Sequence, residues 1–405
     1  MKRRVLLASA TVVAVSWCGV AAAQVISAPT NGNIGQKRLQ IDLSGRILYD
    51  SNVARGQDLV SAVRRLHKEE ITYAPAAQVN AFLPVGRQVL YANLSGGYEF
   101  REYNKTLEAP RISATTGAAV QLGKCGLNIN GTYGYSQSDV SDLPLQVNRN
   151  RQETLGAAAQ VSCSAGVGLT GFVGAQAGAT NNSASDFVID SKVTSFVVGI
   201  GYENRVLGSL QLIGNYSKST YDDSTSPLIQ PAANFEAYSA GVRFSRPIGA
   251  RLRGAASLSY QTVHSDDPLI GDSSSLAGTG ELDYRLNSRI GLNLAYNRGA
   301  AASIIEGVDY VQLTSITFGA RYALSSRLSS SLNASWNKTD YKGPGPLPIG
   351  IATNEKTRVL GGDVTLKVGR TASLALDAHQ EKRTSDKAQF EYTSYQVGAT
   401  ARQSF

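Results

Sequence analysis

The chain has three histidines, the residue type used most often as a general base, so a catalytic site would be sought there first. His67 and His264 lie in segments predicted as long loops, and His379 lies in a predicted strand two residues after Asp377. A serine hydrolase needs such a histidine beside a serine and an oxyanion hole. The chain has no G-x-S-x-G elbow, and the serine and two aspartates after His264 are interpreted as a solvated loop. The sequence therefore predicts no catalytic residue and no enzyme.

Acidic pairs in the loops are the next candidates, because carboxylates bind divalent ions. Asp222-Asp223 and Asp266-Asp267 could hold calcium or bridge lipopolysaccharide through such ions, but neither has the spacing of a calcium loop. The chain also lacks a phosphate-binding loop, a dinucleotide fingerprint and the Cys/His spacing of a metal site. We therefore expect no metal site and no cofactor.

Two cysteines have a spacing that predicts a disulfide. Cys125 opens one predicted strand, and Cys163 closes the strand that runs back beside it. Both fall on the apolar side of their strands, so they share a face and an end of one hairpin, where opposed residues are roughly 4.5 to 5.5 Å apart. We predict a disulfide near the periplasmic rim, with two free thiols packed against lipid as the alternative. Cys18 lies in the leader, and the bulky Trp17 before it argues against acylation.

Charged residues on the polar sides of the predicted strands form the largest candidate site. A wide membrane barrel turns such side chains into its lumen, because facing lipid is costly. Rows of arginine can set a field for anionic solutes, and the alternative is that salt bridges brace the wall. The predicted pore-lining residues are Arg46, Arg101, Arg243, Arg251, Arg253, Arg285, Arg321, Lys367, Glu99, Glu281 and Asp283, with Asp42, Asp363 and Asp377 on the same side. Tyr91, Tyr103 and Phe172 are also expected inward, as lumen filler or as stacking surfaces for sugars.

Strands must position these side chains, and alternation of apolar and polar residues predicts them. Between 39 and 49, Leu39, Ile41 and Leu43 begin an apolar series at every second position, with polar residues such as Gln40 and Asp42 between them. A period of two indicates a strand with one apolar and one polar face. The pattern recurs to the end of the chain, often with aromatic residues at strand ends.

We predict about eighteen antiparallel strands, with sixteen as the alternative count. Their ranges are 38–50, 70–83, 88–102, 109–122, 125–137, 151–163, 166–178, 188–203, 209–221, 235–246, 251–263, 274–286, 289–298, 309–324, 328–340, 357–368, 372–382 and 389–405. Short connectors alternate with longer ones, which is typical of an outer-membrane barrel with tight periplasmic turns and longer extracellular loops. The long segment 51–69 has mildly helical apolar spacing, and we expect it to constrict or plug the lumen.

Composition agrees with a barrel and argues against other classes. The chain is 42% hydrophobic but only 17% charged, has 40 glycines, and lacks a long apolar run after its first thirty residues. A polytopic helical protein would need such runs. A secreted β-sandwich or β-helix would pack large residues between layers, whereas here many Gly and Ala interrupt the apolar faces. The fold class is therefore predicted as an all-β transmembrane barrel.

The first residues predict export. Lys2, Arg3 and Arg4 precede an apolar stretch and an A-x-A site at 21–23, as in a secretory signal peptide; an anchor helix is the alternative. We predict a signal peptide at 1–23, a periplasmic lead at 24–37 and a barrel at 38–405. The formal charge falls from +8 to +5 when the three basic residues of the leader are removed, too mild a balance to predict a nucleic-acid partner. Phe405 ends an amphipathic strand, which resembles the signal read by the barrel-assembly machinery.

Two segments resemble a known family. Residues 47–55, from Ile47 to Arg55, resemble the opening of the putative β-barrel porin type 2 family of Gram-negative outer-membrane proteins, and 98–103 is similar to a strand end common there. The resemblance implies a barrel. It also implies a role in envelope or polysaccharide transport, because members often accompany exopolysaccharide export. It transfers no functional residue.

Three functional hypotheses remain at this stage. The first is an outer-membrane channel or transport accessory, for exopolysaccharide export or for hydrophilic or anionic solutes. The second is an occluded structural or adhesion barrel whose loops bind partners, and the third is a barrel enzyme acting on lipid or peptide. The expected partners are outer-membrane lipid, lipopolysaccharide, the barrel-assembly machinery and a polysaccharide or small hydrophilic solute. The sequence does not indicate the solute, the direction of transport or the oligomeric state.

Overall fold

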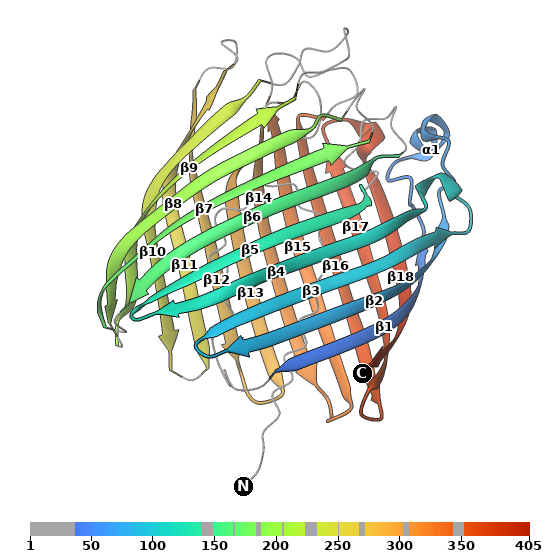
Figure 1. Ribbon diagram of the computed structural model, residues 1–405. Coiled ribbons are helices and arrows are strands. Elements are labelled where there is room, and N and C mark those ends of the chain that lie inside the picture. The colour runs from blue at the N-terminus through green and yellow to red at the C-terminus, as the bar shows by residue number, and fades with distance from the viewer. Residues whose placement is uncertain are drawn as a thin grey trace.

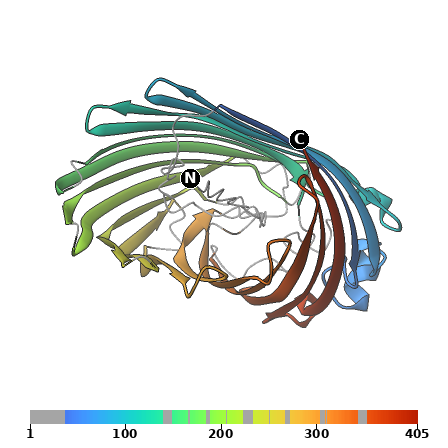
Figure 2. The ribbon, with the colours of Figure 1, turned by 90° about the horizontal axis from the view of Figure 1, so that it is seen from below.

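The computed structural model is a closed antiparallel barrel of eighteen strands (Figures 1 and 2). It describes residues 37–138, 149–164, 167–183, 188–204, 206–222, 233–249, 251–266, 272–302, 308, 310–342 and 352–405. Each strand pairs with its neighbours in sequence, and β1 pairs with β18 to close the sheet. The predicted fold class and the count of eighteen are thereby confirmed.

The strands are long, thirteen to sixteen residues each. Their bounds are β1 Arg38–Asp50, β2 Glu70–Val85, β3 Gln88–Arg101, β4 Ala109–Leu122, β5 Cys125–Gln137, β6 Arg151–Ser164, β7 Gly168–Asn182, β8 Ser191–Asn204, β9 Gly208–Tyr221, β10 Phe235–Ile248, β11 Leu252–Ser265, β12 Ser273–Arg285, β13 Ile290–Ala302, β14 Tyr310–Ala323, β15 Leu328–Lys342, β16 Asn354–Val368, β17 Ala372–Ser385 and β18 Tyr392–Ser404. One helix, α1 (Asp58–Arg64), and two 3-10 turns, η1 (Lys105–Leu107) and η3 (Ala388–Phe390), lie in the described connections.

The register places the apolar series of each strand on one continuous outer surface. Leu39, Ile41 and Leu43 of β1 lie opposite Ala81, Val79 and Ala77 of β2, and around the sheet each outward residue likewise lies opposite an outward residue of the next strand. These outward side chains are exposed, as in Leu155 at 62% and Leu376 at 66%, because the surface that covers them is lipid. The alternation predicted from the sequence is confirmed, since a shift of one residue would exchange the two faces of a strand.

The two ends of the barrel differ in their connections. At one end the strands are joined by short turns, and glycine takes the left-handed conformation at Gly86 (φ 61°), Gly123 (φ 62°) and Gly369 (φ 75°). At the other end the connections are longer. By the usual asymmetry of outer-membrane barrels we assign the short turns to the periplasm and the long connections to the cell exterior.

The seam between the first and last strands is fixed by side chains as well as by backbone. Near the periplasmic end Asp42 pairs with Arg402 at 2.6 Å and accepts a hydrogen bond from Ser404. Near the outer end Asp50 accepts hydrogen bonds from Ser394 at 2.6 Å and from Gln396 at 2.9 Å. The closing pair is therefore held at both ends.

The connection 51–69 departs from its predicted role. Its apolar spacing does form a helix, α1, but the helix lies at the outer rim, outside the ring of strands, rather than inside the lumen (Figures 1 and 2). A small apolar cluster of Val53, Ala54, Leu66 and Leu107 packs this connection against η1. The prediction of a plug formed by 51–69 is thus wrong, because its apolar residues find partners in the neighbouring rim connections.

Strand ends are where the predicted boundaries differ most. β16 begins at Asn354 rather than at 357, and β18 begins at Tyr392 because 388–390 form η3. The predicted signal peptide and lead, apart from Lys37, and the loop residues 343–351 lie outside the described residues. Among the residues that are described, no helix is long and apolar enough to cross a membrane.

Candidate functional site: the lumen of the barrel

The lumen surface is built from alternate residues of all strands, and the register places the predicted pore-lining residues there. Arg46 and Asp42 lie on the side of β1 that faces away from the exposed Leu39 and Ile41, and therefore face the lumen. By the same comparison with the apolar series of each strand, the other predicted pore-lining residues that lie on strands also face the lumen. Arg251 differs, because it lies in the turn just before β11. The role of these residues in a pore remains a prediction.

Some of the inward charges brace the wall. Arg46 on β1 pairs with Asp377 on β17 at 2.7 Å, which ties two strands on either side of β18. Glu99 pairs with Arg101 at 3.2 Å and with Arg111 of β4 at 3.3 Å. For Arg46, Arg101 and Glu99, the salt-bridge alternative considered from the sequence agrees with these contacts.

Other inward charges gather at the periplasmic end on one side of the barrel. We call the set Arg253, Arg285, Arg321 and Lys367, on β11, β12, β14 and β16, the basic arc. No ion pair within 4 Å joins Arg253, Arg285 or Lys367 to another described residue. Asp283 lies directly opposite Arg253 in the register, and Glu281 lies opposite Ala255. Arg243 lies further from the rim, between Gln211 and Ser257. The arc therefore presents four cations to the lumen, and three carboxylates, those of Glu281, Asp283 and Asp363, lie on the lumen side of the same strands.

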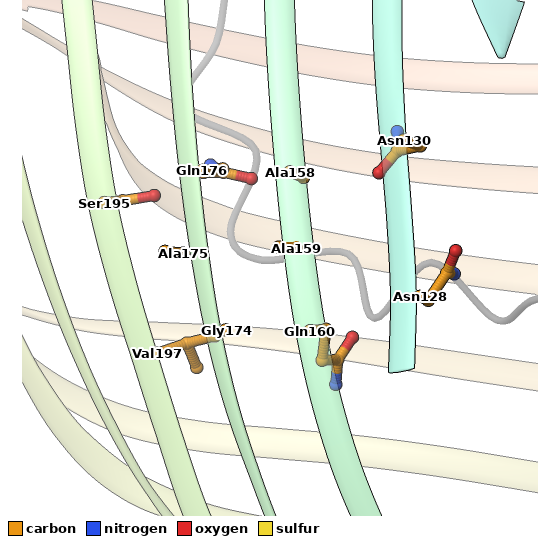
Figure 3. A pocket seen from close by; sticks show the side chains of 10 residues that line it. All are labelled: Asn128, Asn130, Ala158, Ala159, Gln160, Gly174, Ala175, Gln176, Ser195 and Val197. Carbon is orange, nitrogen blue, oxygen red and sulfur yellow. The ribbon is translucent and has the colours of Figure 1, made fainter. Parts of the chain in front are cut away.

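The opposite side of the lumen carries almost no charge. From β5 to β9, Glu203 at the periplasmic end is the one charged residue on the lumen side of the described strands. Amide side chains take the place of charged ones on this part of the lumen. We call Asn128, Asn130, Gln160 and Gln176 the amide wall. Figure 3 shows these side chains with Ser195 on adjacent strands. Together they line a shallow hollow that is open to the lumen.

The amide wall keeps hydrogen-bonding groups available. Among the described residues, neither Asn130 nor Gln160 makes a side-chain hydrogen bond, and an amide both donates and accepts. Glycines keep the hollow open, since a Cβ added at Gly174 would meet Val197 at 3.1 Å. The sequence reasoning noticed polar residues such as Asn128 and Asn130 as signs of a wet interior but did not join them into a site, because the four strands are brought together only by the sheet.

The aromatic residues expected in the lumen separate into two groups. Tyr91 donates a hydrogen bond to Asn128 at 3.3 Å, so its ring lies beside the amide wall. Phe172 lies on the lumen side of β7, next to Gly199 of β8. Tyr103, in contrast, follows β3 and stacks on His67 at the rim, with ring centroids 4.7 Å apart. Its expected place in the lumen is wrong, because the chain has already left the sheet at that residue.

The histidines do not assemble a catalytic triad within the described part of the chain. His264 contacts the carboxylate of Asp272, and His67 stacks on Tyr103. Asp377, expected near His379, is paired with Arg46 instead. No group of three metal-ligating side chains is found among the described residues, and the second aspartate of each acidic loop pair lies outside them.

Cys125 and Cys163 face each other across β5 and β6 in the register. Their Cα atoms are 4.0 Å apart and their Sγ atoms are at bonding distance, 2.05 Å. Both are on the outer, lipid side, at the periplasmic end of the hairpin, as the alternation predicts. Whether the bond forms in the assembled protein remains a prediction.

Comparison with known proteins adds to this geometry. Residues 214–405 match the family model described as putative beta-barrel porin 2. The protein is a porin-like barrel of the bacterial outer membrane. The match confirms the family resemblance, although it begins after the segments 47–55 and 98–103 on which that resemblance was based. The family is one of porins, and the expectation that the chain is no enzyme depends on this family.

Several solved structures are similar to the porin-like barrel at low identity. A BenF-like porin from Pseudomonas fluorescens is 14% identical with a TM-score of 0.48, covering 91% of this chain and 99% of that one. Pseudomonas aeruginosa OccK2, solved in complex with glucuronate, is 11% identical with a TM-score of 0.46, covering 91% and 98%. OprD from the same organism is 13% identical with a TM-score of 0.44, covering 92% and 98%. The search of curated proteins finds no match. Likenesses of this size carry no information on the solute of this chain.

Proposed function

We propose that the porin-like barrel is a passive channel for hydrophilic solutes, with a preference for anions. The observation that supports this is the basic arc, whose four cations lie on the lumen side, and of which Arg253, Arg285 and Lys367 make no ion pair within 4 Å with a described residue. A barrel of this many strands encloses an aqueous channel unless a segment fills it. Cations along such a channel raise the local concentration of anions and disfavour cations.

Planar-bilayer recording tests the proposal. The purified, folded protein is expected to give discrete conductance steps, and a salt gradient is expected to give a reversal potential of the sign for anion preference. A folded protein without conductance would favour the occluded structural or adhesion barrel. A conducting pore with cation preference would remove the basic arc as the determinant of selectivity.

The amide wall favours a second candidate, the passage of saccharide chains. Amides form paired hydrogen bonds with neighbouring hydroxyls and carry no net charge that must be desolvated. Tyr91 and Phe172 could add apolar ring faces beside them. The family resemblance implies a link to exopolysaccharide export. Binding of a saccharide chain in the lumen tests that link on the purified barrel.

Maltohexaose, a neutral oligosaccharide, is a suitable probe. Added to one side of the bilayer, it is expected to block the current transiently, and Gln160→Ala with Gln176→Ala should shorten the blocks. Asn333→Ala is the matched control, since Asn333 is an exposed lumen amide on β15, outside the amide wall. Equal shortening by the control, or no block in the native channel, would contradict a saccharide path.

A further inference from the structure

The outer surface of the barrel carries a group of cations that face one another. We call Arg298, Lys338, Lys356, Arg358 and Lys382 the cationic patch; they lie on β13, β15, β16 and β17. The register places them outward, because Leu360, which shares their side of β16, is 60% exposed on the lipid surface. Lysine and arginine on this surface are expected only where the hydrocarbon ends.

Aromatic residues fix the height of the cationic patch. Tyr296, Ile316 and Trp336 are aligned across β13, β14 and β15, and the same row continues into Arg358 and Lys382. The next row toward the cell exterior contains Arg298, Thr314 and Lys338, followed by Lys356. Tyr and Trp mark the boundary between hydrocarbon and head groups. The patch therefore lies at the level of the head groups of the outer leaflet.

The pairing within the cationic patch is unfavourable by itself. Lys338 is directly opposite Lys356, and Arg358 is directly opposite Lys382. Like charges opposed across strands destabilise a sheet. Lys338 has one acidic neighbour, Asp340 at 2.7 Å, whereas Lys356, Arg358 and Lys382 have no ion pair with any described residue.

Elsewhere on the outer rim, outward cations are paired with carboxylates. On β9 and β10 an aromatic pair, Tyr216 opposite Tyr238, is followed one step outward by Lys218 opposite Glu236. The Lys218 Nζ and Glu236 Oε1 atoms are 2.9 Å apart. Lys192 likewise pairs with Asp222 at 2.9 Å. Opposed cations are thus a local property of β15 to β17 rather than a general property of the rim.

From these observations we propose that the cationic patch binds phosphate groups of a lipid in the outer leaflet. A bound phosphate would replace the repulsion between opposed cations with charge-assisted hydrogen bonds, and arginine can bind it through two N–H groups. Thr314 lies in the row of Lys338 and Lys356, and its hydroxyl is placed to donate to a further phosphate oxygen. This site is on the outer surface and does not depend on the solute of the channel.

Native mass spectrometry of the detergent-solubilised barrel with lipid A tests the proposal. The double variant Arg358→Gln with Lys382→Gln is expected to bind lipid A about thirtyfold more weakly, since each of the two basic residues near an anionic surface contributes on the order of 1 kcal/mol. The matched control is Lys192→Gln with Lys218→Gln, which removes the same charge from paired cations on the same rim and should change binding little. Lipid A without its phosphates should bind the native barrel as weakly as the variant does. Inorganic phosphate should fail to compete at millimolar concentration if the lipid is the ligand, and competition would identify a free-anion site instead.

Thermal unfolding gives a second readout, because the change in stability caused by the substitutions should have opposite signs in detergent and in liposomes that contain lipid A. In neutral detergent, the Arg358→Gln, Lys382→Gln variant should be more stable than the native barrel, because a repulsive pair is removed. In liposomes that contain lipid A it should be less stable, because bound phosphate is lost. A variant with the same sign of change in both media, together with unchanged lipid A binding, would overturn the proposal.

Discussion

Charged lumen residues in this barrel have one of two roles, which depend on whether the side chain makes an ion pair. Arg46 reaches Asp377 across β18 and braces the wall. Arg253 lies opposite Asp283 in the register and Lys367 lies opposite Ser373, but neither makes an ion pair within 4 Å with a described residue, so both leave their charge to the lumen. Alternation in the sequence predicts on which side each residue lies, because strand geometry allows only two sides. It does not predict which arginines are neutralised, because Arg46 and Asp377 are brought together only by closure of the sheet.

Two cations at the periplasmic end of the channel, Arg253 on the lumen side of β11 and Arg251 in the turn before it, should control ion selectivity. Removing Arg251 and Arg253 together, as Arg251→Ala with Arg253→Ala, should shift the reversal potential in a salt gradient toward cations. A unit charge contributes roughly 0.4 kcal/mol to an ion 10 Å away in water before screening. Screening over one Debye length reduces the effect of the two charges to about 0.3 kcal/mol on each ion, of opposite sign for anion and cation, so the anion-to-cation permeability ratio should fall about threefold. Lys192→Ala with Lys218→Ala, outside the lumen, is the control, and an unchanged reversal potential in a conducting double variant would leave Arg251 and Arg253 a structural role.

The disulfide between Cys125 and Cys163 can be tested directly. The exported chain meets an oxidising compartment, and the register places the two residues directly opposite each other. We expect the non-reduced digest of the natively assembled protein to contain both peptides as one linked species. The bond would close 38 residues and stabilise by a few kcal/mol on the chain-entropy model, less where the barrel already constrains the hairpin. Recovery of both peptides as free, alkylatable thiols would remove the bridge.

At the scale of elements, strands were predictable and rim connections were not. Each strand has enough alternating positions to define its two faces, so all eighteen could be located from the sequence. The connection 51–69 has apolar residues at helical spacing, which predicts α1 but not its position. That position depends on contacts with η1 and η3, which belong to other connections. The amide wall could not be predicted for the same reason. Its polar residues are visible in the sequence, but only the order of the strands in the sheet brings them together.

One buried carboxylate organises the rim beside α1. The side chain of Glu70 is fully buried and accepts hydrogen bonds from the backbone of Glu102, Tyr103 and Asn104, at 2.9 to 3.0 Å. Glu70→Ala would leave these N–H groups without their acceptor, at a cost of about 1–3 kcal/mol for each that stays buried. We expect faster cleavage of the folded variant by trypsin after Lys105. Glu102→Ala, an exposed side chain nearby, is the control and should be cleaved at the native rate.

The closure of β16 and β17 at the outer end should depend on pH. Burial alone would raise the pKa of Asp386, but hydrogen bonds from the Thr353 side chain and from the Asn354 and Thr353 amides hold it below its usual 3.8. Because the pKa of Asp386 is lower in the folded state, its carboxylate stabilises the folded rim at pH values above the unfolded pKa of about 3.9. That stabilisation is lost as the pH falls through the lower pKa of the folded state. Exchange of the Thr353 amide, corrected for its intrinsic rate, should accelerate below about pH 4 in the native protein.

The amide of Val53 provides the reference for that measurement. It donates to a backbone carbonyl, that of Lys68 at 2.7 Å, so protonation of Asp386 should not affect it. In Asp386→Asn the acid acceleration at Thr353 should disappear. Acceleration of both amides to the same extent would indicate general acid unfolding of the rim rather than titration of Asp386.

As a whole, the barrel is asymmetric in two directions. Around its circumference, the uncharged amide wall stands opposite strands that carry the basic arc, so a solute would meet a neutral side and a cationic side. Along its axis, the basic arc lies near the short turns and the cationic patch lies outward near the long connections. Both the anion preference and the lipid site depend on the orientation of the barrel in the membrane, which is therefore the property of the whole molecule most worth testing.

Single-cysteine labelling in intact cells tests that orientation. We expect a membrane-impermeant thiol reagent to label a cysteine in the connection 341–356, for example at Gly345, and at Asp58 of α1, whose side chain is 88% exposed. The short turns should stay unlabelled until the cells are opened. The turn at Gly123 and Lys124 tests this, but a new thiol there is adjacent to Cys125 and could exchange with the predicted disulfide, so Arg87 and Arg370 in other short turns are cleaner positions. Labelling at Arg87 but not at Asp58 in intact cells would reverse the barrel, moving the basic arc to the cell exterior and the cationic patch to the inner leaflet.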